Sequence, residues 1–547
     1  MGEMMQIGSN LGTLLSIFLA ASLAPAAPAR AAPPVDADLI NRIADASFNH
    51  SEIAGTEEYL ADRIGGRMTN SPSMREAERW TQERFRAWGL KNVRADGFDF
   101  GRGWWMESSQ LRMTSPRPLG LRSIPIAWTP GTQGPVKASI LVAPLHSEKD
   151  FAQWKGKVQG KFVLVTWPGA PKDETEPAFK RLQEADIAKS DHFVEPEVDL
   201  DRYKKFIEFA TFKRKVDGFL AGEGAIAWAQ MSRSEGRLVH GEGYSYKVGE
   251  TPRLPAFEIA AEDYRRLARL AKSGPVEVEF DSRIHYEDAD HNAYNILAEI
   301  PGTDARAGYV MAGAHLDSWV AGDGAADNGA GSAVVMEAAR ILASLGVKPR
   351  RTIRFVLWAG EEQGLLGSAA YIEKYLAHRG HSPNPEMVAL GPYFEIDAFP
   401  VEPLPGFGEM AGYFNLDNGS GKVRGIYAEG NFAATPILKQ WLAPLASVGA
   451  STVVAEPTGG TDHVLMSRIG LPAFEFIQDP LDYGSRVHHT DLDVYDHLRM
   501  EDLRQAAFVM AVVLMNAANT EAPLPHNVLP TRPTPRDPFK YPDPEEK

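Results

Sequence analysis

Hydrophobic and polar positions follow two different patterns along the chain. From residue 295 onward, short apolar runs alternate with stretches that have helical spacing. We predict strands at 295–300, 309–313, 352–358, 410–416 and 473–477, and helices at 329–345, ending before Gly346, and 501–519. Strands alternating with helices predict an α/β fold, here a three-layer α/β/α sandwich around a mixed, mostly parallel sheet.

The chain before residue 295 divides again. Residues 35–100 are mainly helical in pattern and end in a predicted strand at 93–100. From about 124 to 286, β-type runs follow one another at 139–143, 161–165, 225–228, 255–259 and 276–280, with a charged, helical stretch at 176–215. We therefore predict a β-rich domain, residues 124–286, inserted into a host domain formed by residues 35–123 and 287–521.

The two ends have their own composition. Residues 11–23 form a short apolar run, followed by the small-residue sites Ala24-Pro25-Ala26 and Ala29-Arg30-Ala31. This pattern predicts a secretory signal peptide at 1–31, and thus an exported protein that is periplasmic or secreted. The alternatives are a short membrane anchor or a disordered leader, but the run is short for a membrane span. The segment 522–547 is a Pro-rich, charged tail.

Composition and charge restrict the function without identifying it. The 547 residues exceed what one core supports, and a 44% hydrophobic share is ordinary for a globular protein. The net charge of −15 argues against nucleic acid and anionic membranes as partners. There is no cysteine, which excludes disulfides, thiolate catalysis and Cys-type zinc sites.

Polar residues recur where the predicted strands end. They are His315 and Asp327 after one strand, Glu361 and Glu362 after the next, Asp417 after another, and His489 in a later loop. Because ligands bind at the carboxyl ends of strands in open α/β sheets, we expect these side chains to converge. Two histidines with several carboxylates suit a pair of divalent ions such as zinc.

Each of these residues also has an ordinary structural interpretation. Asp327 could cap a helix, although a carboxylate with two oxygens could also bridge two cations. Asp317 lies two residues after His315 and suits a hydrogen bond to its ring. Glu361 and Glu362 could be a surface pair, or one could bind a metal while the other takes a proton. Each residue is weak evidence alone, and the ordered set carries the prediction.

The same residues carry a family resemblance. Residues 295–497 resemble the M28 family of co-catalytic zinc exopeptidases, through these matching motifs: Ala314-His315-Leu316-Asp317-Ser318, Ala326-Asp327-Asn328-Gly329-Ala330-Gly331, Trp358-Ala359-Gly360-Glu361-Glu362, Asn415-Leu416-Asp417, Gly460-Thr461-Asp462-His463 and His489-Thr490. The layout is most similar to carboxypeptidase Q-like members and to aminopeptidases with a protease-associated (PA) domain, which the inserted region resembles.

The resemblance implies a role for each residue. Asp327 would bridge two Zn²⁺ ions, His315 and Asp417 would complete one ion's shell, and Glu362 and His489 the other's. Glu361 would be the general base, acting on a water shared by the ions, and Asp317 would orient His315. The neighbouring His488 is a second histidine that could take the place of His489 as a ligand, but the family pattern favours His489 as the ligand.

These roles imply an exopeptidase acting on a peptide substrate, with an aminopeptidase or dipeptidase as the leading hypothesis. Two alternatives stay open: a catalytically inactive, receptor-like binding protein of the same fold, and a single-zinc acyltransferase similar to glutaminyl cyclases. Both are disfavoured because the full set of ligands and the base is present. The sequence fixes neither the substrate terminus that is recognised, nor the side-chain preference, nor the oligomeric state.

Overall fold

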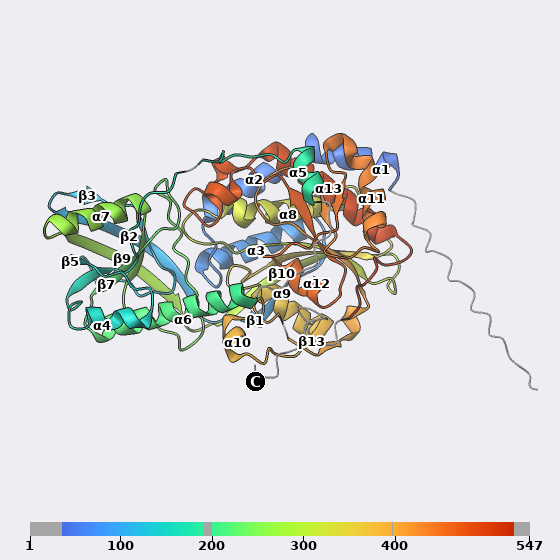
Figure 1. The fold of residues 1–547 in the computed structure, drawn as a ribbon. Helices are drawn as coiled ribbons and strands as arrows, with labels where there is room; N and C mark the ends of the chain where they lie inside the picture. Colours follow the sequence, from blue (N-terminus) through green and yellow to red (C-terminus); the bar gives the residue numbers. More distant parts are fainter. Residues whose placement is uncertain (1–34, 174, 191–199, 397, 530–547) are drawn as a thin grey trace, which may run out of the picture.

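Two eight-stranded sheets lie side by side in the structure, which is a computed structural model (Figure 1). It describes residues 35–173, 175–190, 200–396 and 398–529. The predicted signal peptide, and the predicted tail beyond residue 529, lie outside the described residues. Within those residues, each helix is too short or too polar to cross a bilayer.

The first sheet is built from both ends of the chain. Its strand order is β1-β10-β12-β11-β15-β18-β16-β17. The strands are β1 (Lys91–Asp99), β10 (Asn292–Ile300), β11 (Tyr309–His315), β12 (Thr352–Trp358), β15 (Met410–Asn415), β16 (Val423–Tyr427), β17 (Thr452–Val454) and β18 (Ala473–Gln478). Parallel pairing joins β12, β11, β15 and β18 at the centre, while β1, β10 and β16 add antiparallel pairs. The predicted mixed sheet is confirmed.

Helices cover both faces of this sheet. One face carries α1 (Ala37–Phe48), α2 (Ile53–Glu57), α3 (Pro72–Ala87), α8 (Ala330–Ser344), α11 (Thr435–Leu442) and α13 (Met500–Asn519). The other carries α9 (Leu366–Tyr371) and α12 (His463–Arg468). The alternation along β11 explains the two layers, because Val310 and Ala312 pack into the first core and Met311 into the second. Buried on both faces, the central strands read as continuous apolar runs.

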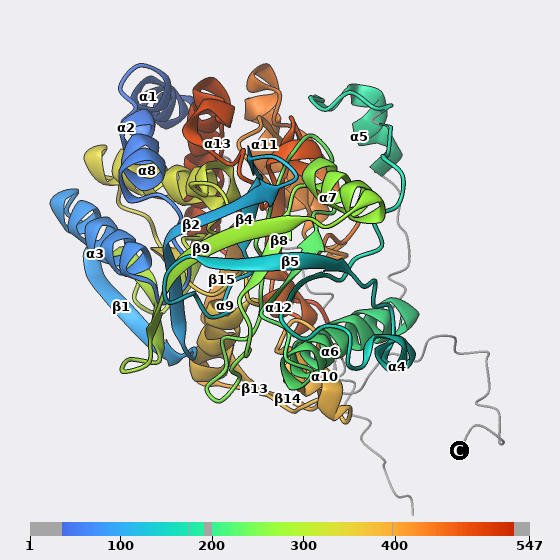
Figure 2. The same cartoon turned by 90° about the vertical axis from the view of Figure 1, so that its left-hand side faces the viewer.

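The second sheet has the order β3-β2-β9-β5-β6-β7-β8-β4. Its strands are β2 (Gly103–Ser115), β3 (Leu119–Gly120), β4 (Ser123–Pro125), β5 (Val136–Val142), β6 (Lys161–Leu164), β7 (Ala227–Met231), β8 (Ala256–Ile259) and β9 (Glu277–Glu287). Helices α4 (Phe151–Trp154), α6 (Leu200–Gly222) and α7 (Ala261–Ser273) accompany it (Figure 2). We call residues 100–291 the second lobe and the rest of the described chain the first lobe.

The second lobe is an excursion between two neighbouring strands of the first sheet. The chain leaves the first sheet at Asp99 and returns at Asn292, and these two residues pair across β1 and β10. The second sheet thus includes β2 and β3, which precede the range 124–286 predicted for the insertion. That residues 124–286 form a PA-like domain of their own stays a prediction.

One predicted helical stretch is wrong in part. Residues 175–183 are not helical, and helix begins only with α5 (Glu184–Ser190). The reason is tertiary docking: Lys180 bridges to Leu481, and Arg181 forms ion pairs with Asp479 and Asp502 of the first lobe. A backbone that pairs with another chain segment cannot also form a helix. This second-lobe segment therefore rests on the first lobe.

Candidate metal centre

Three neighbouring strands of the first sheet end at the same edge. In the parallel register, His315 at the end of β11 lies opposite Trp358 at the end of β12, and Gly313 lies opposite Asn415 at the end of β15. Glu361 and Glu362 follow β12 within four residues, and Asp417 follows β15 within two. The register therefore brings residues that are far apart in the sequence into one site, as the strand-end pattern predicts.

Asp327 lies between two histidines. It belongs to the short turn η3 (Ala325–Gly329) that leads into α8, and its own backbone is not helical. Its Oδ1 is 3.3 Å from Nε2 of His315, and its Oδ2 is 3.3 Å from Nε2 of His489. The two carboxylate oxygens thus face two different imidazole nitrogens, which is the arrangement needed for a carboxylate shared by two cations.

A further carboxylate stands beside each histidine. Asp417 Oδ2 lies 3.4 Å from Nε2 of His315, and Glu362 Oε2 lies 3.0 Å from Nε2 of His489. Glu361 lies on the His315 side, with Oε2 4.0 Å from Nε2 of that ring. Each histidine nitrogen therefore shares its surroundings with Asp327 and one further carboxylate.

Asp317 contacts the site through both its main chain and its side chain. Nδ1 of His315 is 2.9 Å from the main-chain oxygen of Asp317, while the carboxylate lies 3.8 Å from that nitrogen. The carboxylate instead accepts hydrogen bonds from the amides of Glu361 and Glu362, at 3.3 Å each, and from the Thr69 hydroxyl at 2.9 Å. Asp317 thereby connects the His315 ring to the adjacent glutamates.

The charges of this cluster favour a bound cation. Six buried carboxylates surround the two imidazoles: Asp317, Asp327, Glu361, Glu362, Asp417 and Asp462. Oε1 of Glu362 is buried and lacks a hydrogen-bond partner among the described residues, and Oδ2 of Asp327 faces Nε2 of His489 at 3.3 Å without a hydrogen bond. Burying more carboxylates than the two imidazoles can neutralise is costly unless a further positive charge offsets them. The donors, imidazole nitrogen and carboxylate oxygen, are those that zinc accepts, so the residues fit the predicted metal.

The pKa values show what burial does to these groups when no cation is bound. Burial raises the pKa of Glu362 to about 7, although His489 acts against this shift. Burial also raises the pKa of Glu361 well above its ordinary value, with Asp417, Asp462 and Glu362 adding to the effect. For His315, burial lowers the pKa, but Asp417 and Glu361 outweigh it and raise the pKa well above the usual range. Without a cation, burial and the neighbouring carboxylates therefore favour the protonated forms of the two glutamates.

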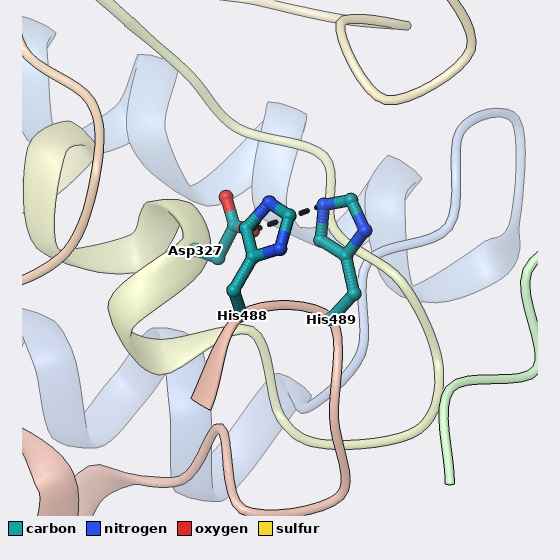
Figure 3. Close-up of side chains that lie close together, drawn as sticks. All are labelled: Asp327, His488 and His489. Atoms are coloured by element: carbon teal, nitrogen blue, oxygen red, sulfur yellow. Dashed lines mark ion pairs between the residues drawn. The ribbon is translucent and has the colours of Figure 1, made fainter. Parts of the chain in front are cut away.

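His488 and His489 differ in their distance from the carboxylates. Their rings stack with centroids 3.7 Å apart, next to Asp327 (Figure 3). Nε2 of His488 is 3.9 Å from Oδ2 of Asp327, and the His488 side chain is 43% exposed. The His489 side chain is 16% exposed, and its Nε2 is closer to Asp327 and also contacts Glu362. Of the two histidines, His489 is the better placed as a ligand.

Several residues around the site were not predicted. Asp493 accepts hydrogen bonds from the amides of Ala326, at 2.5 Å, and Asp327, at 3.1 Å. Glu475 accepts one from the Asp417 amide, at 2.9 Å. Glu475 lies inside an apolar strand, so its position in the sequence was an available signal. Glu242, in a loop of the second lobe, bonds to Nδ1 of His489, and nothing in its local sequence marks it.

Comparison with known proteins shows which proteins this chain is similar to. The family model described as peptidase family M28 matches residues 295–514. The chain is 25% identical to carboxypeptidase Q of Bos taurus over 478 residues, which covers 86% of this chain and 85% of the relative. It is 38% identical to leupeptin-inactivating enzyme 1 of Streptomyces exfoliatus over 181 residues, 33% of this chain and 34% of that protein.

Solved structures share the fold over most of the chain. The peptidase M28 precursor from Shewanella amazonensis aligns with a TM-score of 0.61 at 23% identity, covering 90% of this chain and 98% of that one. The zinc aminopeptidase BSAP from Bacillus subtilis aligns with a TM-score of 0.53 at 20% identity, covering 85% and 94%. Both alignments extend beyond the first sheet, so these structures share the fold over most of the chain.

Proposed function

We propose that this chain, a metallopeptidase whose residues 295–514 match peptidase family M28, is a two-zinc exopeptidase that hydrolyses the terminal bond of peptides or dipeptides. One observation carries the proposal. The two oxygens of Asp327 face Nε2 of His315 and Nε2 of His489 at the same distance, 3.3 Å. A carboxylate placed in this way suits two adjacent ions better than one.

Five residues would hold the two ions. Asp327 would contribute one oxygen to each, His315 and Asp417 would complete one shell, and Glu362 and His489 the other. Such ions, when bound, lower the pKa of a shared water and polarise the scissile carbonyl. The buried carboxylates, which burial otherwise pushes toward their protonated forms, would stay ionised beside the ions.

Glu361 would then carry the proton. It is buried beside His315 but lies farther from that ring than Asp327 and Asp417 do. We propose that its carboxylate takes a proton from the attacking water and gives it to the leaving amine. Peptide hydrolysis is balanced in this way, because water supplies the hydroxyl of the new acid and the proton of the new amine. General acid–base catalysis of this kind contributes roughly 10²–10⁴-fold.

The end of the peptide that is recognised is tested by comparing substrates. Relatives are named as a carboxypeptidase and as aminopeptidases, so both ends are candidates. The second lobe lies beside the metal centre, since Glu242 contacts His489. We propose that this lobe, as a PA-like domain, limits substrate length and leaves the chemistry to the first lobe. Hydrolysis of aminoacyl amides, free dipeptides and N-blocked peptides should be compared to distinguish the specificities.

We also propose that the protein is exported. The support is the sequence pattern of residues 11–31, an apolar run followed by small-residue cleavage sites. N-terminal sequencing of the protein recovered from its native host tests this. Export predicts a start after one of the small-residue sites, whereas a mature protein that still begins at Met1 would contradict it.

A further inference from the structure

The loop that carries His489 is attached to the second lobe on both sides of that residue. Two residues after His489, Asp491 donates its amide to the oxygen of Val239 at 3.2 Å and accepts the Val239 amide at 3.1 Å. Arg122, also of the second lobe, forms an ion pair with Asp491. Earlier in the loop, Ser485 donates its hydroxyl to the oxygen of Ala178 at 2.7 Å. The first lobe alone therefore does not determine the path of this loop.

Glu242 makes the contact closest to the metal centre. Its Oε1 forms a hydrogen bond with Nδ1 of His489, the ring nitrogen opposite to the one that faces Asp327 and Glu362. Two guanidinium nitrogens of Arg233 hold the same carboxylate, at 2.5 and 2.8 Å. The Glu242 side chain is 17% exposed. The carboxylate is thus fixed between an arginine and the histidine.

The backbone around Glu242 is packed too tightly to move easily. Gly241 has a φ of +74°, a conformation that favours glycine. A Cβ on Gly243 would lie 2.2 Å from the oxygen of Ala127, so this loop fits against the segment that follows β4 only with glycine at that position. Glu242 is therefore presented to His489 from a defined position.

The two histidines of the centre are held in different ways. His315 is oriented by the main-chain oxygen of Asp317, which lies in its own strand-end loop. His489 has a φ of +61°, which is unfavourable for a non-glycine residue and persists only where the surroundings enforce it. A histidine that binds a metal through Nε2 needs a partner on Nδ1 to fix its tautomer and ring orientation. For His489 that partner comes from the other lobe.

We infer that Glu242 is a positioning residue for His489, and that the second lobe thereby completes one of the two ion sites. The inference rests on the proposed two-zinc function and goes beyond it, because it makes the Glu362–His489 ion dependent on a residue outside the first lobe. In the described part of the chain, the groups that position His315 and Asp417 are the first-lobe residues Asp317 and Glu475. The second lobe would then control how much of the enzyme carries both ions, in addition to any role in binding the substrate.

The test is zinc binding by the full chain, measured by calorimetric titration of metal-free protein and by elemental analysis after dialysis. We expect wild type to bind two ions. We expect Glu242→Ala to keep one ion at wild-type affinity and to bind the other about 10- to 100-fold more weakly, the usual effect of removing a ligand's hydrogen-bond partner. Glu242→Gln keeps an acceptor without the charge, so it should fall between the two.

Glu235→Ala is the matched control. Glu235 forms a similar two-nitrogen pair with Arg265 in the same lobe, at 2.8 and 2.5 Å. This variant should bind both ions as wild type does. Thermal unfolding of each metal-free variant identifies a general loss of folding, and if Glu242→Ala fails to fold, Glu242→Gln decides.

Two negative results are distinguishable. If wild type binds two ions and the folded Glu242 variants bind both with unchanged affinity, or lose both equally, the positioning role is wrong while the two-zinc function stands. If wild type itself binds only one ion, the two-zinc function is wrong. A selective loss of one ion in Glu242→Ala, with Glu235→Ala unchanged, supports the inference.

Discussion

Nε2 of His489 lies 3.3 Å from Oδ2 of Asp327, on the side of that carboxylate opposite to His315. The two residues are 162 positions apart in the sequence, and the loop of one meets the turn before α8 only in the folded chain. This contact brings the two halves of the proposed site together. Because Asp327 faces both histidines, its substitution should affect both ions, whereas substitution of a residue beside one histidine should affect one ion.

Asp327→Asn should lose both ions. An amide offers one weak neutral acceptor where the carboxylate offers two charged oxygens, so neither shell would be complete. Asp417→Asn, which changes a residue beside His315 alone, should lose one ion and keep the other. Zinc content after dialysis measures the difference. Equal losses in the two variants would show that Asp327 does not bridge.

Glu361→Gln should lower kcat by roughly 10²–10⁴-fold, because the general base is lost, and should leave the zinc content unchanged. Glu362→Gln should lower the zinc content, since Glu362 lies 3.0 Å from His489 on the proposed ligand side. The two isosteric changes at adjacent positions are controls for each other. If the zinc losses are the same, the assignment of the two glutamates is wrong.

His463 should stabilise the loop that carries Asp417. The ring is fully buried, with Nε2 3.2 Å from Glu429 and Nδ1 3.2 Å from Glu475, which in turn accepts the Asp417 amide. Burial lowers the pKa of His463, but Glu429 and Glu475 outweigh it and raise the pKa to about 10. His463→Gln should therefore lower the free energy of unfolding by about 3–5 kcal/mol at pH 7, as expected when a buried charge loses its partner.

The pH dependence has a defined sign. An unfolded histidine titrates near pH ~6.5, so the raised folded pKa gives a contribution that is fully present below that pH and is lost as the pH rises through about 10. The difference in unfolding free energy between wild type and His463→Gln should shrink over this range. His381→Gln, at a side chain that is 79% exposed, is the control and should change little. A difference independent of pH would mean that His463 is neutral in the fold.

Tyr244 should affect longer substrates. Its side chain belongs to the second lobe, is 47% exposed and packs edge-on at 5.6 Å against Trp319, whose ring is 6.0 Å from that of His489. Tyr244→Ala should raise KM for tripeptides and longer peptides about 2- to 10-fold, the value of one aromatic contact of ~0.5–1.5 kcal/mol, with kcat on a minimal substrate unchanged.

Phe48→Ala provides the comparison for Tyr244→Ala, because Phe48 is a partly exposed aromatic residue on α1 that packs against Phe508 of α13. Phe48→Ala should leave KM for longer peptides and kcat on a minimal substrate unchanged. A fall in kcat on the smallest substrates in a zinc-replete Tyr244→Ala enzyme would instead place Tyr244 among the groups that contact the reacting atoms, contrary to the division of roles between the lobes proposed above.

The sequence was most informative for strands and helices whose own residues show a clear apolar pattern. The predicted bounds of β12 agree with the structure. Helix α8 is one residue shorter than predicted at both ends, and α13 begins one residue earlier than predicted. The short strands β16 and β17, the last two strands on one side of the first sheet, were missed because they depend on their neighbours. Long β2 was also missed, since its polar residues hide the alternation.

For the site too, the sequence predicts residues placed by their own strands and misses those placed by tertiary contacts. The strand-end rule brings together His315, Asp327, Glu361, Glu362 and Asp417, because parallel register determines where strands end. Glu242 could not be found in this way, since its contact with His489 depends on how one lobe docks on the other. The part played by the main-chain oxygen of Asp317 was also outside reach, because the sequence indicates side chains and not the direction of a carbonyl.

Anomalous diffraction at the zinc edge, from crystals of the zinc-loaded protein, shows whether two zinc ions share Asp327. We expect two anomalous peaks about 3.5–4 Å apart, on either side of the Asp327 carboxylate. One should contact His315 and Asp417, and the other Glu362 and His489. A single peak, or a second peak away from Asp327, in fully active protein would mean that Asp327 does not bridge two ions.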